Sequence, residues 1–264
     1  MSLRGIVTPR YSTKYLVGLL KQYLVRDNVP RTLRDTLKPM LIPCYNLETA
    51  GSFLFLRTRA LIDEKWNFTL WEICHATSAV PSFFKPAKLR STNGETSCVA
   101  IDGGLVMNNP TAGAITHVLH NKVEFPRVEG TKDMLVLSLG TGQFDQKYEY
   151  GRVQHWGAFQ WAKPVVKIVL DGISDMVDHT VSIRASWQSF DGDGDGHKSN
   201  VKKLVKLADE MLASPCMEHL PYGGRVEVLD RSNKDCLDWF VEQLIREHHE
   251  RGSNTHVHFH DMCI

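Results

Sequence analysis

The stretch that decides the fold is Cys98-Val-Ala-Ile-Asp-Gly-Gly-Leu-Val-Met-Asn-Asn-Pro110. The short apolar run at its start, Cys98 to Ile101, predicts a buried strand. Asp102 follows this strand directly, and Gly103 and Gly104 follow Asp102. Glycine takes a positive φ without strain and lets other backbone come close. The pattern therefore predicts a strand that ends in a carboxylate and a tight glycine turn.

A helix is expected directly after this turn. Asn109 is a favoured N-cap residue, and Pro110 suits the first helical position, so we predict a helix over Thr111 to Leu119. In open α/β sheets, ligands bind beyond the carboxyl ends of the strands, which is where Asp102 would lie. Asp-Gly pairs are also common in plain turns. The local pattern therefore leaves two roles open for Asp102: a functional carboxylate, or a residue that only forms the turn.

Composition places the chain among ordinary globular proteins. Its 264 residues suffice for one large domain or two small ones, and 42% are hydrophobic and 23% charged. The formal net charge of +1 does not indicate a protein whose overall electric field attracts nucleic acid. No apolar run reaches the roughly 20 residues of a transmembrane segment, and the N-terminus lacks a signal-peptide core. We expect a cytoplasmic protein that meets membranes only at their surface.

The cysteines predict no disulfide framework. They are far apart, form no Cys-x-x-Cys pair, and several lie in apolar runs. We interpret them as reduced packing residues. They are Cys44, Cys74, Cys98, Cys216, Cys236 and Cys263.

The part of the chain before Asp102 predicts helices and a hairpin. Apolar residues at helical spacing predict an amphipathic helix over Lys14 to Arg26. Pro39 to Asn46 and Ser52 to Leu56 are apolar runs on either side of a turn, which predicts a β-hairpin. Thr69-Leu-Trp-Glu72 fits a capping box and opens a helix that continues to Ala79.

Two residues on that helix could form a catalytic pair. His75 and Ser78 are three residues apart and share a face. A serine inside a helix is poorly presented as a nucleophile, so packing of the helix is the favoured role for this face.

After the Asp102 stretch the chain becomes mainly helical. Met134 to Ser138 predicts one more buried strand, and it is followed by the glycine turn Leu139-Gly-Thr-Gly142. This turn is a weak phosphate-nest signal and is not a Walker A loop, because no Gly-Lys-Ser/Thr follows. Helical periodicity then covers 156–183, 200–212 and 233–250, and no internal repeat is present.

Two segments have the spacing of metal sites. Asp191-Gly-Asp-Gly-Asp-Gly196 matches the start of an EF-hand loop, but the twelfth position is Lys202 instead of a bidentate Glu. His256-Val-His-Phe-His260, with Asp261 and Cys263 behind it, could present histidines on one side of an extended segment. We favour a solvated acidic loop and an exposed tail, and we predict no metal and no cofactor.

Four segments together resemble a known family. They are Cys44-Tyr-Asn-Leu-Glu-Thr-Ala-Gly-Ser-Phe, Trp71-Glu-Ile-Cys-His-Ala-Thr-Ser-Ala-Val-Pro-Ser-Phe-Phe84, Ile101-Asp-Gly-Gly-Leu-Val-Met-Asn-Asn-Pro110 and Leu137-Ser-Leu-Gly-Thr-Gly142. Their order over 39–142 resembles the later part of the catalytic domain of the patatin-like phospholipases, the plant lipid acyl hydrolases. The helical region after Gly142 is similar to the C-terminal extension of the plant patatin-related group.

This resemblance implies a three-layer α/β fold with a mostly parallel central sheet. It implies that residues 1–145 are the C-terminal part of a patatin-like catalytic domain and that residues 146–264 are a mainly helical extension. Family members hydrolyse phospholipid or galactolipid esters at membrane surfaces with a Ser–Asp dyad. The family's Asp-Gly-Gly/Ala motif maps onto Asp102, Gly103 and Gly104, so the resemblance implies that Asp102 is the base that activates the serine. A glycine-rich loop supplies the oxyanion hole.

One departure from the family concerns the nucleophile. The sequence contains no Gly-x-Ser-x-Gly elbow and no Gly-Gly-Gly-x-Arg-Gly loop, and only 38 residues precede the family segment that begins at Pro39. We therefore expect a sheet that is incomplete on its N-terminal side, with an exposed edge open to self- or family-association. Two functions stay open: a lipid acyl hydrolase by descent, of which only the Asp is present, and a catalytically inactive, truncated relative that binds lipid or protein.

Overall fold

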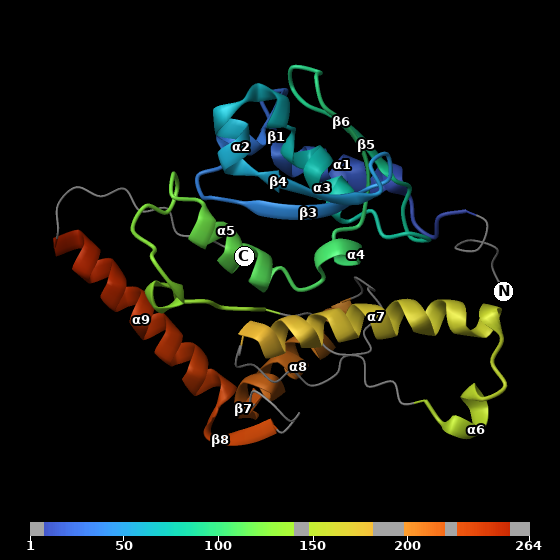
Figure 1. The fold of residues 1–264 in the computed structure, drawn as a ribbon, viewed down its shortest axis with the longest axis vertical. Coiled ribbons are helices and arrows are strands. Elements are labelled where there is room, and N and C mark those ends of the chain that lie inside the picture. Colours follow the sequence, from blue (N-terminus) through green and yellow to red (C-terminus); the bar gives the residue numbers. More distant parts are fainter. Residues whose placement is uncertain (1–7, 140–147, 182–197, 220–225, 254–264) are drawn as a thin grey trace. The chain divides into compact units, whose positions relative to one another are not determined.

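The computed structural model describes residues 8–139, 148–181, 198–219 and 226–253. The chain divides into two compact units, one that runs up to Thr131 and one that begins at Lys132 (Figure 1). Helices and strands alternate in the first unit, which confirms a mixed α/β fold.

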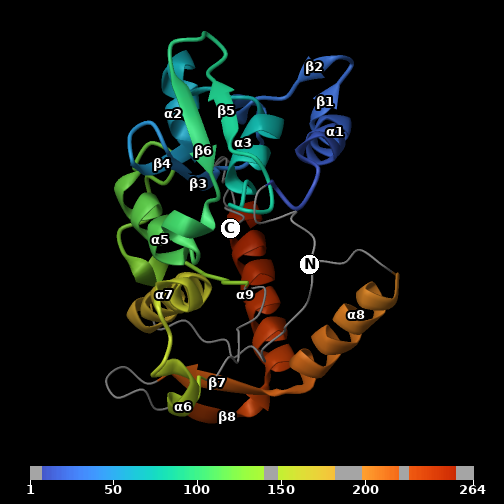
Figure 2. The ribbon, with the colours of Figure 1, turned by 90° about the vertical axis from the view of Figure 1, so that its right-hand side faces the viewer.

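The first unit is built on a four-stranded sheet. Its strands are β3 (Leu41–Asn46), β4 (Gly51–Leu56), β5 (Ala87–Arg90) and β6 (Ser97–Ile101), in the order β4-β3-β6-β5 (Figure 2). All three pairings in this sheet are antiparallel. The expected mostly parallel sheet is therefore not what the described strands form. The physical reason is connectivity, because β3–β4 and β5–β6 are joined by short turns that only antiparallel neighbours can use.

The predicted hairpin over residues 39–56 is confirmed. β3 and β4 pair along their full length, from Leu41↔Leu56 to Asn46↔Gly51. The second hairpin, β5–β6, pairs Ala87 with Ala100 and has Gly94 in its turn at φ 77°, a left-handed conformation that glycine takes without strain. The two hairpins meet where β3 pairs with β6.

The core of the first unit lies between the sheet and the helix α3 (Leu70–Thr77), which packs on β3, β5 and β6. Aromatic rings fill its centre: Phe55 and Phe68 are fully buried and meet edge to face, with ring centroids 5.3 Å apart. Such pairs add to the gain from burial alone. The other fully buried core members include Leu33, Cys44, Ile73, Leu89 and Cys98.

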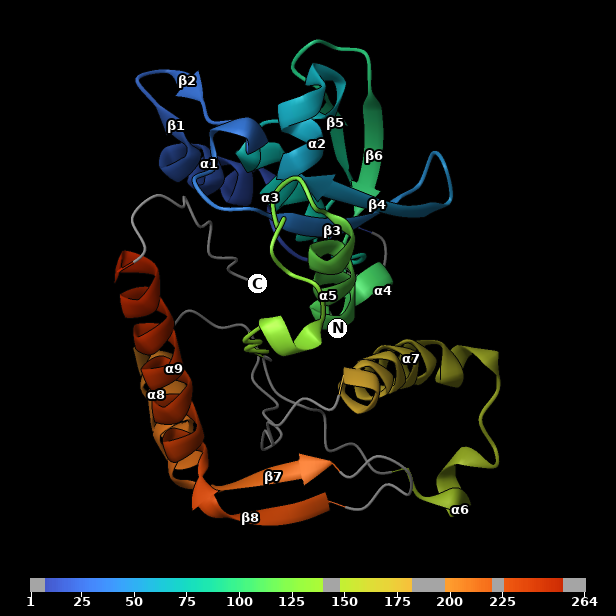
Figure 3. The ribbon, with the colours of Figure 1, turned by 60° about the vertical axis from the view of Figure 1, so that its left-hand side comes forward.

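The remaining elements of the first unit surround this core (Figure 3). They are α1 (Thr13–Leu24), the strand pair β1 (Val25–Arg26) and β2 (Val29–Pro30), α2 (Arg57–Ile62), α4 (Gly104–Met107), α5 (Thr111–His120), and 3-10 turns at Leu33–Asp35 and Glu64–Trp66. A further 3-10 turn, Thr131–Asp133, spans the boundary between the two units. The predicted first helix is confirmed as α1. It contacts α3, and Lys21 lies over the Trp71 ring at 4.2 Å from its centroid.

The second unit is mainly helical, as predicted, but it also contains a hairpin that the sequence did not predict. Its elements are α6 (Tyr150–Val153), α7 (Ala158–Val181), α8 (Lys198–Ala213), β7 (Pro215–His219), β8 (Val226–Ser232) and α9 (Asn233–Ser253). β7 and β8 pair antiparallel. The strand predicted at Met134 to Ser138 is wrong, because this described segment belongs to no strand and pairs with none.

Several predictions fall on residues outside the described ranges: the glycine turn at 140–142, the acidic loop Asp191–Gly196 and the histidine tail His256–His260. Within the described ranges no cluster of His, Cys, Asp and Glu could hold a metal ion. No helix there is long and apolar enough to cross a membrane. No disulfide joins the five described cysteines.

Candidate functional site at Asp102

Asp102 directly follows β6, where the backbone at the end of α3 and just beyond it holds the turn. Its N–H donates to the Ala79 carbonyl at 3.2 Å, and the next N–H, of Gly103, donates to the Thr77 carbonyl at 3.0 Å. The Thr77 hydroxyl in turn donates to the Pro43 carbonyl of β3 at 2.8 Å. The end of α3 therefore clamps the turn against the sheet and fixes the position of the carboxylate.

The Asp102 carboxyl is partly buried. This burial raises the pKa of Asp102 above its ordinary range, because removing a carboxylate from water disfavours its charged form. The Gly104 backbone N–H donates to the carboxylate and opposes that shift of the pKa. A carboxylate with a raised pKa accepts a proton more readily than an exposed aspartate does, as a general base requires.

Gly103 is required for close approach and not for a positive φ. Its φ is −67° and its ψ is −29°, which is ordinary helical backbone. A Cβ at this position would lie 2.4 Å from the Pro43 carbonyl oxygen and 2.6 Å from Thr77 Oγ1. Gly104 is looser, since a Cβ there would meet Asp102 Oδ2 at 3.1 Å and Asn108 Oδ1 at 3.3 Å. Neither glycine of the turn uses the positive φ that glycine allows, and the close approach of other backbone is confirmed at Gly103.

The helix after the turn begins at Thr111 as predicted, but its N-cap residue is Pro110 and not Asn109. The N–H groups of Val106 and Met107 donate to the Gly103 carbonyl at 3.0 and 2.9 Å, which makes the single turn of α4. α5 then begins at Thr111 with Pro110 as its N-cap residue, and Asn109 Oδ1 accepts the Thr111 N–H at 3.1 Å. Asn109 therefore still satisfies a free N–H at the start of the helix, but from outside the cap position.

His75 and Ser78 do not form a catalytic pair. His75 is 8% exposed, and its Nε2 atom has no hydrogen-bond partner. Burial lowers the pKa of His75, and a backbone hydrogen bond with Lys85 opposes this. Ser78 is exposed at the C-terminal end of α3. This agrees with the packing role favoured for this helix face.

The capping box predicted at the start of α3 takes a different form. Thr69 is the N-cap residue, but its hydroxyl donates to the Glu72 carboxylate at 2.5 Å and caps no backbone N–H. Burial raises the pKa of Glu72, and this hydrogen bond opposes the shift.

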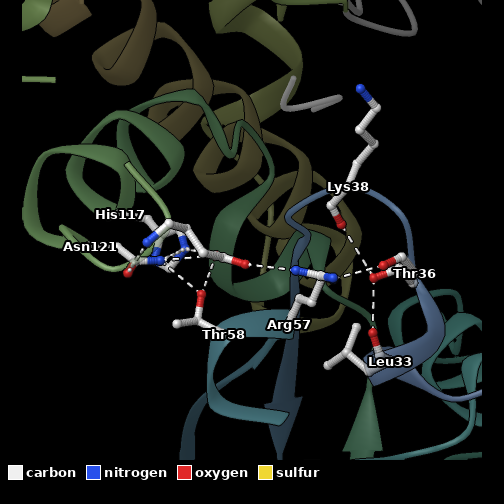
Figure 4. A network of polar contacts seen from close by, with 8 residues as sticks. Leu33, Thr36, Lys38, Arg57, Thr58, His117 and Asn121 are labelled. Carbon is white, nitrogen blue, oxygen red and sulfur yellow. Dashed lines mark hydrogen bonds and ion pairs between the residues drawn. The ribbon is translucent and has the colours of Figure 1, made fainter. Parts of the chain in front are cut away.

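A buried polar network that no sequence pattern predicted anchors the far end of α5 (Figure 4). Arg57 Nη1 lies 3.1 Å from Glu124 Oε1, and their side chains are only 13% and 6% exposed. The Thr58 hydroxyl donates to Glu124, and Asn121 Nδ2 donates to both Thr58 Oγ1 at 2.8 Å and Glu124 Oε2 at 3.0 Å. Arg57 Nε also donates to the Thr36 carbonyl at 2.7 Å. The network ties the segment after α5 to the start of α2.

His117 forms the edge of this network. Its Nε2 lies 4.0 Å from Glu124 Oε2, and its ring meets Phe125 edge to face at 6.2 Å. Burial lowers the pKa of His117, while the Glu124 charge opposes the shift and the Arg59 charge adds to it. No local periodicity links Arg57 with Glu124, so only a three-dimensional structure could reveal the pair.

Comparison with known proteins agrees with the fold motifs described above. The sequence profile of the family described as patatin-like phospholipase matches residues 3–115, which include all four strands of the sheet and the Asp102 turn. The chain is 48% identical over 240 residues to "Patatin-like protein 6" of Arabidopsis thaliana, a match that covers 84% of this chain and 48% of that protein. The chain belongs to the patatin-like phospholipase family.

Other relatives in this family differ in what their names state. "Patatin-like protein 7" of Arabidopsis thaliana is 44% identical over 253 residues, which cover 89% of this chain and 52% of that protein. "Probable inactive patatin-like protein 9" of the same plant is 42% identical over 240 residues, which cover 89% of this chain and 61% of that protein. The chain spans about half the length of the first of these curated relatives.

Proposed function

We propose that this chain is the base-bearing part of a patatin-like lipid acyl hydrolase. In this proposal Asp102 activates a serine that belongs to a family segment outside the present sequence, and the substrates are phospholipid or galactolipid esters at a membrane surface. The observation that carries the proposal is the Asp102 carboxylate itself. It is partly buried, has a raised pKa and is held at the end of β6 by the backbone of α3.

The chemistry assigned to Asp102 is proton transfer. The ionised carboxylate accepts the serine hydroxyl proton while the serine oxygen attacks the ester carbonyl carbon. The tetrahedral intermediate then collapses, and the proton on Asp102 passes to the leaving alcohol. A water molecule, deprotonated by the same carboxylate, hydrolyses the acyl-enzyme and restores the serine. The tight packing at Gly103 supports this role, because it keeps the carboxylate at a fixed position through both steps.

We extend the proposal to the architecture of the family domain. Residues 1–145 are assigned to the C-terminal part of a three-layer catalytic domain, with residues 146–264 as its helical extension. The mostly parallel strands of the family sheet would come from the segment that carries the serine. Two observations support this: the chain spans about half of its curated relatives, and the described sheet has outer strands, β4 and β5, whose free edges could pair further.

A second candidate function is a non-catalytic module that binds lipid or protein. It is favoured by the 42% identity to a protein named as probably inactive. In that case the Asp102 carboxylate would serve only to accept the Gly104 N–H and close the turn.

A gain-of-function experiment separates the two candidates. A patatin-family segment with the glycine-rich loop and the Gly-x-Ser-x-Gly elbow is fused ahead of residue 3, and hydrolysis of a short-chain p-nitrophenyl ester is measured. The controls are the 264-residue chain alone, the same fusion with the elbow serine replaced by alanine, and the fusion with Asp102→Ala or Asp102→Asn.

We expect no turnover by the chain alone and turnover by the fusion. Turnover should fall by at least about a hundredfold in either Asp102 variant, which is the scale of one general base. Activity that survives Asp102→Ala but disappears with the elbow serine would remove Asp102 from the mechanism. A folded fusion without any activity would favour the non-catalytic module.

A further inference from the structure

The helix α7 exposes a continuous apolar face, and the proposed hydrolase function gives this face no role. Val166, Val169, Ile173 and Met176 recur every three or four positions, and Phe159 lies two turns before Val166, so these residues share one side of the helix. Phe159 at the start of the helix is 93% exposed. The other exposed apolar residues are Val165, Val166, Ile168, Val169, Ile173 and Met176.

Aromatic rings gather at the N-terminal end of this helix. Trp156 packs edge to face on Tyr148 at 5.7 Å and on Trp161 at 5.1 Å between ring centroids. Phe159 follows one turn after Trp156 and is exposed, as is Tyr150 in α6. Aromatic side chains of this kind concentrate at the interface between a bilayer and water, because their rings fit the headgroup region.

Charge along this part of the chain is strongly segregated. The segment 150–170 contains Arg152, Lys163 and Lys167 and not a single Asp or Glu. Acidic residues begin only at Asp171, in the second half of α7. The half of the helix that carries the aromatic cluster is therefore purely cationic, which complements an anionic surface.

We propose that segment 150–170 is a membrane-surface anchor that lies in the headgroup region of an anionic phospholipid bilayer. Phe159 and the valines of α7 enter the acyl boundary, and the net positive charge of the segment attracts anionic headgroups. The helix lies on the bilayer and does not cross it, since no helix of the described chain is apolar enough to span. This deepens the proposed function, on which it rests for the choice of lipid, by naming the element that meets the substrate surface.

Vesicle co-sedimentation of the 264-residue chain tests the anchor. The vesicles are phosphatidylcholine alone and phosphatidylcholine with about one third phosphatidylglycerol, each at low and at high salt. Phe159→Ser is compared with Tyr23→Ser, which removes an aromatic ring that is 74% exposed on α1. Lys163→Glu with Lys167→Glu is compared with Lys202→Glu with Lys203→Glu, the same charge change on α8. Circular dichroism confirms that each variant stays folded.

We expect the chain to bind the anionic vesicles at least about tenfold more tightly than vesicles of phosphatidylcholine alone. High salt should weaken the binding to the anionic vesicles. Phe159→Ser and the α7 charge reversal should each weaken binding by about tenfold or more, while both controls bind like the parent chain. Equal losses in a variant and its control would overturn the proposal, and so would a chain that binds neither vesicle. A dimer in size-exclusion chromatography that Phe159→Ser dissociates would show that a second copy covers this face instead of a membrane.

The outcome is independent of the chemistry at Asp102. Asp102→Ala should bind vesicles as tightly as the parent chain, because the anchor does not include that residue. If vesicles do not bind but the fusion described above hydrolyses its soluble ester, then only the anchor fails. If vesicles bind but the fusion is inactive, then only the proposed hydrolase fails.

Discussion

Replacing Gly103 with alanine tests the packing that fixes Asp102. The added Cβ would lie 2.4 Å from the Pro43 carbonyl oxygen and 2.6 Å from Thr77 Oγ1. Pro43 is main chain inside β3, and its carbonyl already accepts the Thr77 hydroxyl at 2.8 Å. Neither atom can move away without displacing the sheet or the end of α3.

The expected cost follows from the size of this overlap. Ordinary van der Waals contacts of a Cβ begin at 3.4 Å, so the new atom would be about 1 Å too close to the Pro43 oxygen. Overpacking a well-filled site costs roughly 1–3 kcal/mol, and a backbone wall places Gly103→Ala near the upper end. We therefore expect a loss of about 3 kcal/mol in the free energy of unfolding of the first unit, a large part of a typical domain's stability.

Gly104→Ala is the matched control. Its Cβ would meet only side-chain oxygens, at 3.1 and 3.3 Å, and these can shift by a few tenths of an ångström. Alanine also gains up to about 1 kcal/mol over glycine within a helix, so the two effects nearly cancel. The difference between the two positions agrees with the motif that this chain resembles, which accepts glycine or alanine at the third position but only glycine at the second.

The assay is urea unfolding, and the hydrogen exchange of the β3 and β6 amides is the signal that monitors it. These amides report on the first unit alone, which matters because a chain of two units need not unfold in one transition. Gly130→Ala, where a Cβ would meet nothing within 4 Å, sets the baseline. Gly103→Ala and Gly104→Ala with stabilities within about 0.5 kcal/mol of each other would refute the reasoning.

Three further predictions concern charged groups. Glu124→Gln should lower the free energy of unfolding of the first unit by about 3 kcal/mol, because Arg57, 13% exposed, loses its buried partner; urea titration beside the exposed Glu95→Gln checks this, and equal losses would contradict it. Acidification from about pH 7 to about pH 5 should destabilise the first unit, since burial lowers the pKa of His117 and the unfolded chain then binds more protons than the folded one. The dependence of the free energy of unfolding on pH, measured by urea titration, should become weaker in His117→Gln. An unchanged dependence would show that His117 does not contribute to the acid destabilisation. In the elbow fusion, ester hydrolysis should rise with pH through the raised pKa of Asp102, because only its carboxylate can accept a proton; an acid limb at the ordinary aspartate pKa would contradict this.

Local sequence signals predicted the elements around the site well. The apolar runs on either side of residues 47–51 gave the β3–β4 hairpin, and the run before Asp102 gave β6. Both signals depend on neighbours within a few residues, as strand and turn patterns do. The order of four motifs then indicated the family, which comparison with relatives confirmed.

Features that depend on distant partners escaped prediction. The antiparallel pairing of β3 with β6 joins Tyr45 to Ile101, and no local pattern encodes such a pairing. The run Met134 to Ser138 has strand composition but no partner strand within the described residues, so composition alone misled there. At the site, the glycine pattern correctly predicted a tight turn with close backbone approach, but only the structure shows that the approaching atom is the Pro43 carbonyl oxygen. The role of Asp102 itself stays a prediction.

The narrow contact between β3 and β6 has a consequence for the order of folding. The two hairpins of the sheet close short loops, but the contact between them is short: it consists of the pairs Tyr45↔Ile101 and Asn46↔Ala100 and a hydrogen bond from the Leu47 N–H to the Val99 carbonyl at 2.8 Å. Forming it closes the whole chain between the two hairpins. Closing a longer loop costs more chain entropy, so we expect each hairpin to form early and their union to form late. Asp102 directly follows Ile101. We therefore expect the carboxylate to reach its position late in folding, so that a substitution that slows this step delays the maturation of the site more than the collapse of the core.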